Sequence, residues 1–257
     1  MSNEIRSMHV LAASVLSQLT ANTLPSQESD SRAIAAVERS ADIAIQRSGI
    51  GRRFWGASLG DVPRSPAQAA AMAKLADYCR DQKPQKCDMG DSGGAGGRQT
   101  SPTTKESNGG SSGRETGAMA GDGIMLIGDP GAGKTYLLAA ALREMARHGK
   151  AVKYLTVEGF FVGLRGCMGQ AAKLSESEYL ASLKEPDFLV LDDLQYIQDG
   201  ESYQRRMLWL LLDMRYADCR ATLTASNRTI AELRDMFDAR TLRRFEAEVI
   251  AIIRGGK

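Results

Sequence analysis

The segment that most constrains this chain runs from Gly128 to Thr135 and reads Gly-Asp-Pro-Gly-Ala-Gly-Lys-Thr. Its spacing fits GxxxxGK[ST], the pattern of a phosphate-binding loop. A short apolar run, Ile124 to Ile127, precedes the loop, and a strongly helix-forming stretch, Tyr136 to Leu142, follows it. Because strand, loop and helix occur in the order that phosphate binding needs, the segment predicts a nucleotide site. A chance glycine loop is the alternative.

Each residue type in the loop has a physical role. Glycines let the backbone pass close to the phosphates, so that backbone N–H groups and the helix N-terminus face the anion. Lys134 neutralises charge near the β and γ phosphates, and Thr135 donates an oxygen ligand to Mg²⁺. The predicted nucleotide contacts are Gly128, Asp129, Pro130, Gly131, Ala132, Gly133, Lys134, Thr135 and Tyr136.

An acidic pair follows another apolar run. Phe188 to Leu191 is entirely apolar and ends in Asp192 and Asp193. Since the carboxyl ends of parallel strands lie at one edge of a sheet, the pair is expected beside the phosphate loop. Asp192 is the predicted magnesium ligand, directly or through water, and Asp193 is predicted to orient and polarise the attacking water. Two solvated carboxylates at a strand end are the alternative.

Three further polar residues are candidate catalytic groups. Asn227 follows the run Ala221 to Ala225, where a neutral amide can contact the water or the γ-phosphate without adding negative charge. Ser-Asn is also ordinary turn chemistry. Arg240 and Arg244 lie on a helical stretch, and phosphoryl transfer gains from an arginine that a neighbouring subunit places on the γ-phosphate. The alternative for either arginine is a solvated basic helix end.

Five short apolar runs alternate with helical stretches in the second half of the chain. They are Ile124 to Ile127, Val152 to Val157, Phe188 to Leu191, Ala221 to Ala225 and Val249 to Ile253. Such alternation predicts an α/β fold in which a parallel five-stranded sheet has helices on both faces. The functional loops are then expected at the carboxyl ends of the strands.

A segment poor in apolar residues, Asp88 to Gly123, divides the chain. It holds 11 of the 26 glycines and no Val, Ile, Leu, Phe, Tyr or Trp. Because it cannot bury enough apolar surface to offset its chain entropy, it is predicted to be a flexible tether. The predicted domains are a helical partner-binding region over 1–87 that leads into the core, the tether over 88–123, and a nucleotide-binding core over 124–257.

A small helical region is expected before the tether. Apolar residues at helical spacing mark three amphipathic helices, near residues 5–19, 34–45 and 67–80. Ser65 and Pro66 supply the N-cap and the first turn of the third helix. Between the second and third helices, the loop Arg47 to Trp55 joins cations to two large aromatic residues. That combination suits either base stacking or packing on the core.

Overall composition excludes several classes of protein. A net charge of +2, from 33 Lys and Arg against 31 Asp and Glu, rules out a strongly basic DNA-coating protein but allows a local basic patch. The spacings of the four cysteines match neither a CxxC zinc pair nor a redox motif. No apolar run approaches the length of a membrane span.

These residues resemble the AAA+ ATPases of the DnaC helicase-loader and IstB transposition-helper type. The likeness rests on Gly128 to Thr135 as Walker A, Leu189 to Asp193 as Walker B, Leu223 to Asn227 as the sensor I strand, and Ala239 to Arg244 as the arginine-finger region. It extends upstream of the tether to Arg47-Ser-Gly-Ile50. Nearly everything from about residue 45 is covered.

The resemblance implies cofactors, partners and a division of roles. ATP and Mg²⁺ are bound by Lys134 and Thr135, Asp192 supports the metal, and there is no C-terminal lid domain. Asp193 stands where many AAA+ members have Glu, and its shorter reach implies weak hydrolysis that DNA or a partner stimulates. Arg244 is the preferred arginine finger and Arg240 the reserve. The implied partners are a hexameric replicative helicase, held by the N-terminal helices, single-stranded DNA, and further copies of the chain in a cytoplasmic homo-oligomer without membrane attachment.

Three functions are compatible with these motifs. They are an ATP-dependent helicase loader, a transposition-helper ATPase that binds duplex DNA and a transposase, and a weakly hydrolysing ATP-controlled interaction module. The first two use the same motor, so the core motifs do not separate them. The segment Phe160 to Gln170 occupies the place where loaders carry an element that grips single-stranded DNA. Arg165 suits phosphate contact there, whereas Phe160, Phe161 and Leu164 at helical spacing are typical of core.

Overall fold

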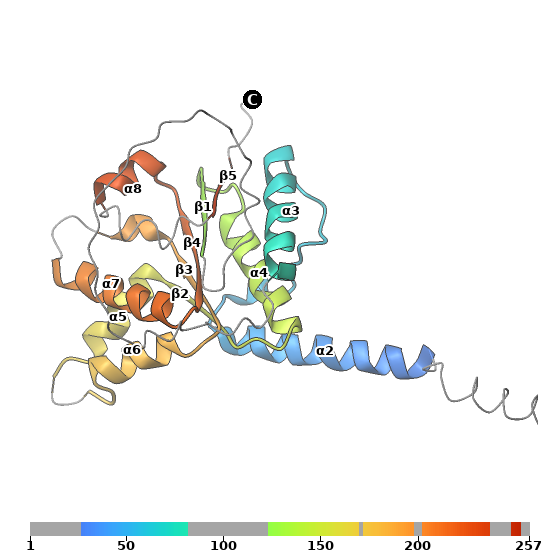
Figure 1. Cartoon of the computed structure of the whole chain (residues 1–257), viewed down its shortest axis with the longest axis horizontal. Helices are drawn as coiled ribbons and strands as arrows, with labels where there is room; N and C mark the ends of the chain where they lie inside the picture. The colour runs from blue at the N-terminus through green and yellow to red at the C-terminus, as the bar shows by residue number, and fades with distance from the viewer. Residues whose placement is uncertain (1–26, 82–122, 170–171, 198–201, 237–247, 253–257) are drawn as a thin grey trace, which may run out of the picture.

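The computed structural model describes residues 27–81, 123–169, 172–197, 202–236 and 248–252. Figure 1 shows a central sheet with helices on both sides. The strands are β1 (Ile124–Gly128), β2 (Val152–Thr156), β3 (Phe188–Asp192), β4 (Ala221–Ser226) and β5 (Glu248–Ile252). The α-helices are α2 (Gln27–Ser48), α3 (Pro66–Asp81), α4 (Lys134–Arg147), α5 (Val157–Gly166), α6 (Glu176–Lys184), α7 (Ser202–Ala217) and α8 (Ile230–Met236). Two short 3-10 helices are η1 (Arg52–Phe54) and η2 (Leu194–Tyr196).

The five strands form one parallel sheet in the order β2-β3-β4-β1-β5. β4 therefore lies between the strand that precedes the phosphate loop and the strand that ends in the acidic pair. Ile127 is paired with Ser226, one residue before Asn227. Consequently the three predicted functional segments meet at the carboxyl edge of the sheet. The predicted five-stranded parallel sheet with helices on both faces is confirmed.

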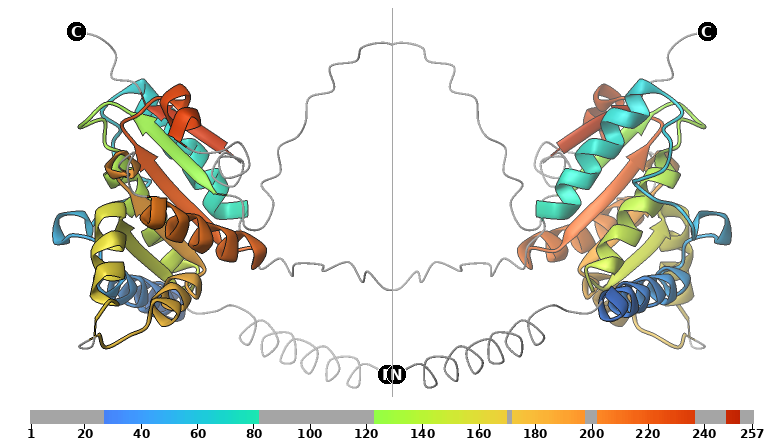
Figure 2. Two further views of the ribbon diagram at one scale, coloured as in Figure 1. Left: turned by 90° about the vertical axis from the view of Figure 1, so that its left-hand side faces the viewer. Right: turned by 90° about the vertical axis from the view of Figure 1, so that its right-hand side faces the viewer.

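Two apolar clusters lie on opposite faces of the sheet, because successive strand residues point to opposite sides. In β1, Ile124 and Leu126 face the cluster formed with α2, α3 and α4. Met125 and Ile127 face the cluster formed with α5, α6 and α7. The two side views of Figure 2 show α3 on one face of the sheet and α7 on the other.

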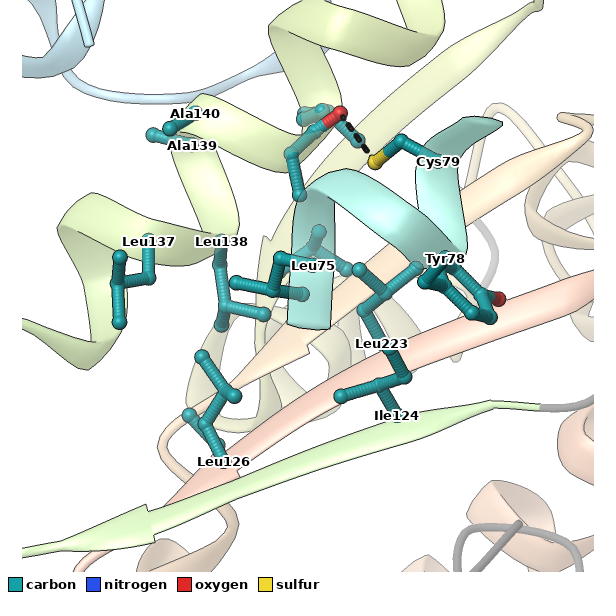
Figure 3. Close-up of a cluster of buried hydrophobic side chains, with 14 of the residues drawn as sticks. Leu75, Tyr78, Cys79, Ile124, Leu126, Leu137, Leu138, Ala139, Ala140 and Leu223 are labelled. Carbon is teal, nitrogen blue, oxygen red and sulfur yellow. Dashed lines mark hydrogen bonds between the residues drawn. The ribbon is translucent and has the colours of Figure 1, made fainter. Parts of the chain in front are cut away.

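The third predicted helix, α3, packs into the same apolar cluster as the sheet. The N–H of Gln68 donates to Ser65 Oγ at 3.1 Å, which confirms the predicted N-cap. Leu75 is fully buried and lies between α4 and the sheet, next to Ile124 (Figure 3). Spacing predicts a face of Ala69, Met72, Ala76 and Cys79, of which Met72 and Cys79 are buried, and the buried face also includes Ala71, Leu75 and Tyr78. α3 is thus part of the core that supports the phosphate loop.

The second predicted helix, α2, contacts the core only along its C-terminal half. Ala41 and Ile45 are buried, whereas Ile34 is 65% exposed and Val37 is 45% exposed. Figure 1 shows the N-terminal half of α2 extending beyond the body of the molecule. The apolar stripe predicted from spacing therefore continues past the surface that it packs against.

The loop with two aromatic residues packs on the core. Phe54 and Trp55 are half-buried against the cluster that contains α3 and α4. The indole N–H of Trp55 donates to the carbonyl oxygen of Ile50 at 3.1 Å. The guanidinium carbon of Arg53 lies 4.4 Å from the centre of the Phe54 ring. Of the two interpretations given to this loop, packing is the one that these contacts support.

The aromatic residues after β2 are also core residues. Phe160, Phe161 and Leu164 are buried in the second apolar cluster, whereas Arg165 is exposed. The aromatic side chains of this segment are therefore not available for base stacking. The exposed positions of α5 and the turn after it carry Arg165 with Val162 and Met168.

Several predictions fall outside the described residues. They concern the helix near residues 5–19, almost the whole of the tether over 88–123, and the arginine-finger region Ala239 to Arg244 with both Arg240 and Arg244. In the described ranges, no helix is long and apolar enough to cross a membrane.

Candidate nucleotide and magnesium site

The phosphate-binding loop depends on glycine at three positions. Gly131 has φ 79° and Gly133 has φ 94°, a left-handed conformation that strains other residues. A Cβ atom at Gly128 would overlap the carbonyl oxygen of Ile252 in β5. The loop ends where α4 begins, at Lys134, so its backbone N–H groups and the helix N-terminus face the same point.

Lys134 is held by three oxygen acceptors. Its Nζ donates to the carbonyl oxygens of Gly128, at 2.7 Å, and Asp129, at 2.9 Å, and to Oδ1 of Asn227. The side chain is 8% exposed, and burial lowers the pKa of Lys134, while the nearby carboxylates, chiefly Asp192, oppose that effect. The structure thus brings Asn227 to the phosphate loop, as its place after β4 predicts.

Asp192 is buried at the end of β3 and is 1% exposed. Its Oδ2 accepts hydrogen bonds from Thr135 Oγ1 at 2.7 Å and from Tyr154 Oη at 2.9 Å. Its Oδ1 accepts the backbone N–H of Asp193 at 2.8 Å. Burial raises the pKa of Asp192 and these hydrogen bonds, first that of Thr135, oppose the rise. Thr135 and Asp192, the two predicted magnesium ligands, are in direct contact.

Asp193 has an uncommon backbone conformation, φ 63° and ψ 50°. This left-handed turn directs the chain from β3 into η2 and places Asp193 on the wall of the same cavity as Lys134. Gln195 Nε2 donates to Asp193 Oδ1 at 2.8 Å, and Gln195 Oε1 accepts the backbone N–H of Asn227 at 3.4 Å. Gln195 therefore links two predicted catalytic residues, which no sequence pattern indicated.

The donor set at this edge of the sheet fits magnesium. No cluster of three or more His, Cys, Asp or Glu side chains able to hold a metal occurs in the described part of the chain. Magnesium in nucleotide sites needs only one or two protein oxygens, because phosphates and water supply the others. The Thr135 hydroxyl donates its proton to Asp192, which leaves an oxygen lone pair for a metal. Thr135 and Asp192 are thus a suitable pair of oxygen groups.

A cavity of about 760 Å³ lies between the phosphate loop and the segment around η1 and α3. Its lining residues are Arg53, Phe54, Asp61, Val62, Arg64, Gln68, Met72, Pro130, Gly131, Gly133, Lys134, Thr135, Tyr136, Asp193 and Asn227. The volume is within the range of small-molecule sites. Residues 53–72 form about half of the wall, although their sequence indicated only a helix and a loop.

Gln68 is the buried polar residue of that wall. It is 5% exposed, and its Oε1 accepts the backbone N–H of Arg64 at 2.6 Å. Since a backbone N–H can only donate, this bond fixes the carboxamide orientation and leaves Nε2 toward the loop. A Cβ atom at Gly133 would lie 2.9 Å from that Nε2. The N-cap predicted at Ser65 places Gln68 in the first turn of α3. It does not indicate that Gln68 lies against the phosphate loop.

The predicted loop residues divide by what they contribute. Pro130, Gly131, Gly133, Lys134, Thr135 and Tyr136 line the cavity, whereas Gly128 and Asp129 contribute carbonyl oxygens to Lys134. Ala132 packs against the apolar cluster of α3 and α4. The Tyr136 hydroxyl donates to Asp61 and so connects α4 to the loop before α3.

Comparisons with known proteins support the same assignment. A family model described as "IstB-like ATP binding protein" matches residues 119–245. The replicative helicase loader DnaC of Escherichia coli K12 is 27% identical over 121 residues, which are 47% of this chain and 49% of DnaC. The phage-like element PBSX protein XkdC of Bacillus subtilis is 31% identical over 140 residues, 51% of this chain and 50% of XkdC. Residues 119–245 thus match a DnaC/IstB-like AAA+ domain. The chain spans about half the length of the curated relatives that it matches.

Solved structures share the architecture of this AAA+ domain. A crystal structure of the DnaC helicase loader matches with a TM-score of 0.58 and 18% identity, over 79% of this chain and 99% of that one. The replication initiator DnaA, bound to AMPPCP and single-stranded DNA, matches with a TM-score of 0.57 and 17% identity, over 80% of this chain and 52% of that one. At such identities the likeness establishes the AAA+ fold alone.

Proposed function

We propose that this protein is an ATP-dependent helicase loader of the DnaC type, which binds a replicative helicase and single-stranded DNA and hydrolyses ATP during loading. The observation that carries the proposal is the convergence of Lys134, Thr135, Asp192, Asp193 and Asn227 at the phosphate-binding loop. The similarity of the AAA+ domain to DnaC supports the loader role.

Lys134 and Asn227 suit a site that responds to the γ-phosphate. All three protons of the ammonium group have acceptors, two backbone carbonyls and the Asn227 amide. An anionic phosphate oxygen is a stronger acceptor than a neutral amide. ATP would therefore replace Asn227 at Lys134 and leave the amide to contact the attacking water. Asn227 is in this proposal the residue that distinguishes ATP from ADP.

Hydrolysis is assigned to Asp193 with help from a second subunit. Gln195 orients the Asp193 carboxylate toward the cavity, where it would polarise the attacking water. Thr135 and Asp192 hold magnesium, which neutralises charge on the β and γ phosphates when it is bound. Arg244 of a neighbouring copy, with Arg240 in reserve, would stabilise the charge that develops on the γ-phosphate.

The adenosine is assigned to the part of the cavity beyond the loop. Phe54, Val62 and Met72 provide apolar surface there, and Gln68 Nε2 provides a hydrogen-bond donor. The same wall carries Arg53, Asp61 and Arg64. Its apolar side chains beside one buried donor suit a purine base, which has a flat apolar face and acceptor nitrogens at its edge.

Partner recognition is assigned to residues 1–87, which precede the proposed tether over 88–123 and the nucleotide-binding segment over 124–257 in the sequence. Within that region, α3 belongs to the core, whereas Ile34 and Val37 on α2 are exposed. An amphipathic helix with an exposed apolar stripe suits docking into a groove of a partner. The N-terminal helices therefore are the proposed contact with the hexameric helicase.

The decisive experiment is transfer of a hexameric replicative helicase onto single-stranded DNA. The full chain should co-purify with the helicase and promote ATP-dependent loading. Lys134→Ala should abolish loading, because Lys134 contacts the phosphate loop, while the control Lys150→Ala, at the end of the α4–β2 turn, should not. A chain that binds ATP but neither binds a helicase nor promotes its loading contradicts the proposal.

A second candidate, a transposition helper, is favoured by the match of residues 119–245 to the IstB-like family model. Such a helper would bind duplex DNA and a transposase. A comparison of ATP-dependent binding to single-stranded DNA and to duplex DNA of equal length separates the helicase loader from the transposition helper. Preference for duplex DNA, with ATP-dependent filaments on it, would replace the loader proposal by the helper.

A third candidate is an ATP-controlled interaction module that scarcely turns over ATP. Asp193 in place of the longer Glu, and the need for an arginine from another subunit, favour it. Phosphate release measured with and without single-stranded DNA tests this reading. DNA-stimulated turnover that Lys134→Ala removes would exclude a pure switch.

A further inference from the structure

Tyr154 lies in the middle of β2, the strand next to β3. It is two residues before Thr156, which is paired with Asp192. Because residues two apart on a strand share a face, Tyr154 is a diagonal neighbour of Asp192, within reach of a long side chain. Its hydroxyl donates to Asp192 Oδ2 at 2.9 Å. A regular strand, not a loop, therefore carries this donor to the carboxylate.

The hydrogen bonds of Asp192 fix the rotation of its carboxylate. Oδ2 accepts from both Thr135 and Tyr154, and Oδ1 accepts from the backbone N–H of Asp193. The Thr135 donor belongs to the phosphate loop, whereas Tyr154 belongs to the sheet. Tyr154 is thus the only side-chain donor to Asp192, among the described residues, that does not belong to the nucleotide loop.

We propose that Tyr154 is a positioning residue for the magnesium site, whose phenol hydroxyl holds Asp192 in the orientation that supports the metal. The inference rests on the proposed function only so far as nucleotide and magnesium bind at the phosphate loop. Tyr154 acts through Asp192 and does not itself touch the metal. Hydrogen bonds to a carboxylate are about twice as strong as neutral ones, so the phenol is an effective tether.

The ring of Tyr154 has a separate structural role. It packs, half-buried, against the apolar cluster of α2, α3 and α4. The backbone of Tyr154 is also close to α2, since a Cβ atom at Gly49 would lie 2.8 Å from the Tyr154 carbonyl oxygen. Tyr154→Phe keeps the ring and the strand and removes the hydroxyl alone. This substitution therefore separates the positioning role from packing.

The test uses the full chain and a fluorescent ADP analogue, titrated with magnesium and, separately, in EDTA. For Tyr154→Phe, we expect the magnesium concentration that gives half of the metal-dependent tightening to rise about 10- to 150-fold, the range for losing a hydrogen bond to a charged group. Affinity in EDTA should stay within about twofold of the wild type, because metal-free nucleotide does not depend on Asp192 orientation.

Tyr179→Phe is the matched control. Tyr179 is also half-buried, and its hydroxyl donates to the Phe160 carbonyl oxygen at 3.4 Å, on the other face of the sheet. The magnesium concentration that Tyr179→Phe requires for half of the metal-dependent tightening should equal that of the wild type. Equal magnesium titrations for Tyr154→Phe and wild type overturn the positioning role, and so does an equal loss of affinity with and without metal. A wild type that binds no nucleotide overturns the proposed function as well.

A measurement on the wild type covers the case in which Tyr154→Phe does not fold. With ¹³Cζ-labelled tyrosine, each of the seven tyrosines gives one NMR signal from the carbon that bears the hydroxyl. Adding magnesium to the ADP-bound chain should shift the signal of Tyr154, because the acceptor Asp192 becomes engaged by the metal; Tyr136→Phe, which removes the signal of the tyrosine that lines the cavity, should retain this shift. If no tyrosine signal responds to magnesium while nucleotide binding tightens, the inference fails.

Discussion

Asp193 and Asp192 are neighbours in the chain but have opposite environments. Asp192 is buried and accepts three hydrogen bonds, whereas Asp193 turns into the cavity through a left-handed backbone conformation. A buried carboxylate with fixed donors suits a supporting role, and a carboxylate facing a cavity suits contact with water. The two residues therefore suit different proposed roles, because β3 ends at Asp192 and the chain turns at Asp193.

Asp193→Asn should separate nucleotide binding from turnover. The amide keeps the size of the side chain but no longer attracts a proton from water, so we expect phosphate release to fall about 100-fold or more. Affinity for ATP should change by less than about threefold. Phosphate release and fluorescent nucleotide binding, measured on the same preparation, check both expectations.

Asp77→Asn is the control for that substitution. Asp77 lies on the exposed side of α3 and pairs with Arg80 at 3.0 Å. The rate of phosphate release by Asp77→Asn should match that of the wild type. Turnover of Asp193→Asn equal to that of Asp77→Asn would show that another group polarises the water.

The positions of residues that belong to a local pattern were predictable, and the positions of residues that reach the site through distant contacts were not. Lys134, Thr135 and Asp192 follow from motif spacing, since the order of strand, loop and helix fixes where they point. Gln68 lies against Gly133, which is 65 residues later in the chain, and Tyr154 donates to Asp192, which is 38 residues later. No local pattern encodes such contacts, because they arise from the strand order and from packing of α3.

At the scale of elements, α2 and α4 are joined by charged groups as well as by apolar packing. Arg143 on α4 reaches Asp42 at 2.6 Å and Glu38 at 3.2 Å. Arg147 reaches Glu38 at 2.8 Å. Since α4 begins at Lys134, these pairs connect the N-terminal helix to the element that carries the phosphate loop. Amphipathic spacing predicted α2, and the helix-forming stretch after the phosphate loop predicted α4, but neither indicated that the two helices pack together.

Glu38→Gln should lower the free energy of unfolding by about 0.5 to 1 kcal/mol at pH 7. The effect is small because the Glu38 side chain is 40% exposed and water screens its pairs. The hydrogen bond from Arg147 is the main cause that lowers the pKa of Glu38 in the folded chain. A lowered folded pKa stabilises the fold above the unfolded pKa, and this contribution is lost as the pH falls through the folded pKa.

Urea denaturation at several pH values checks this expectation. The difference between wild type and Glu38→Gln should be full at pH 7, should begin to fall near the unfolded pKa of Glu, about 4.3, and should vanish at acid pH below the lowered folded pKa. It should also shrink in 1 M salt. Glu158→Gln, at an exposed position in the first turn of α5, is the control. A difference that persists at acid pH would assign the effect to packing and not to charge.

At the scale of the whole molecule, one chain brings a phosphate loop, the buried carboxylate of Asp192 and the cavity-facing carboxylate of Asp193 to one sheet edge. In the proposed mechanism, an arginine from a neighbour completes this site. Head-to-tail contacts of that kind generate a ring or a helical filament. Because the monomer carries a net charge of only +2, DNA contact would depend on arginines that assembly places in a row.

Mixing two inactive variants tests whether the site is shared between subunits. Arg244→Ala should bind ATP but lose turnover, and Lys134→Ala should lose ATP binding. At a mixed interface, the intact phosphate loop of the Arg244→Ala chain faces the intact arginine of the Lys134→Ala chain, so a mixture should recover turnover in proportion to such interfaces. With equal amounts and random assembly, about a quarter of interfaces pair the two intact halves. Phosphate release from mixtures in several ratios, compared with each variant alone, measures the recovery. If both variants are folded and associate with each other but no ratio restores turnover, the arginine that completes the site is not Arg244, and Arg240→Ala becomes the next partner to mix.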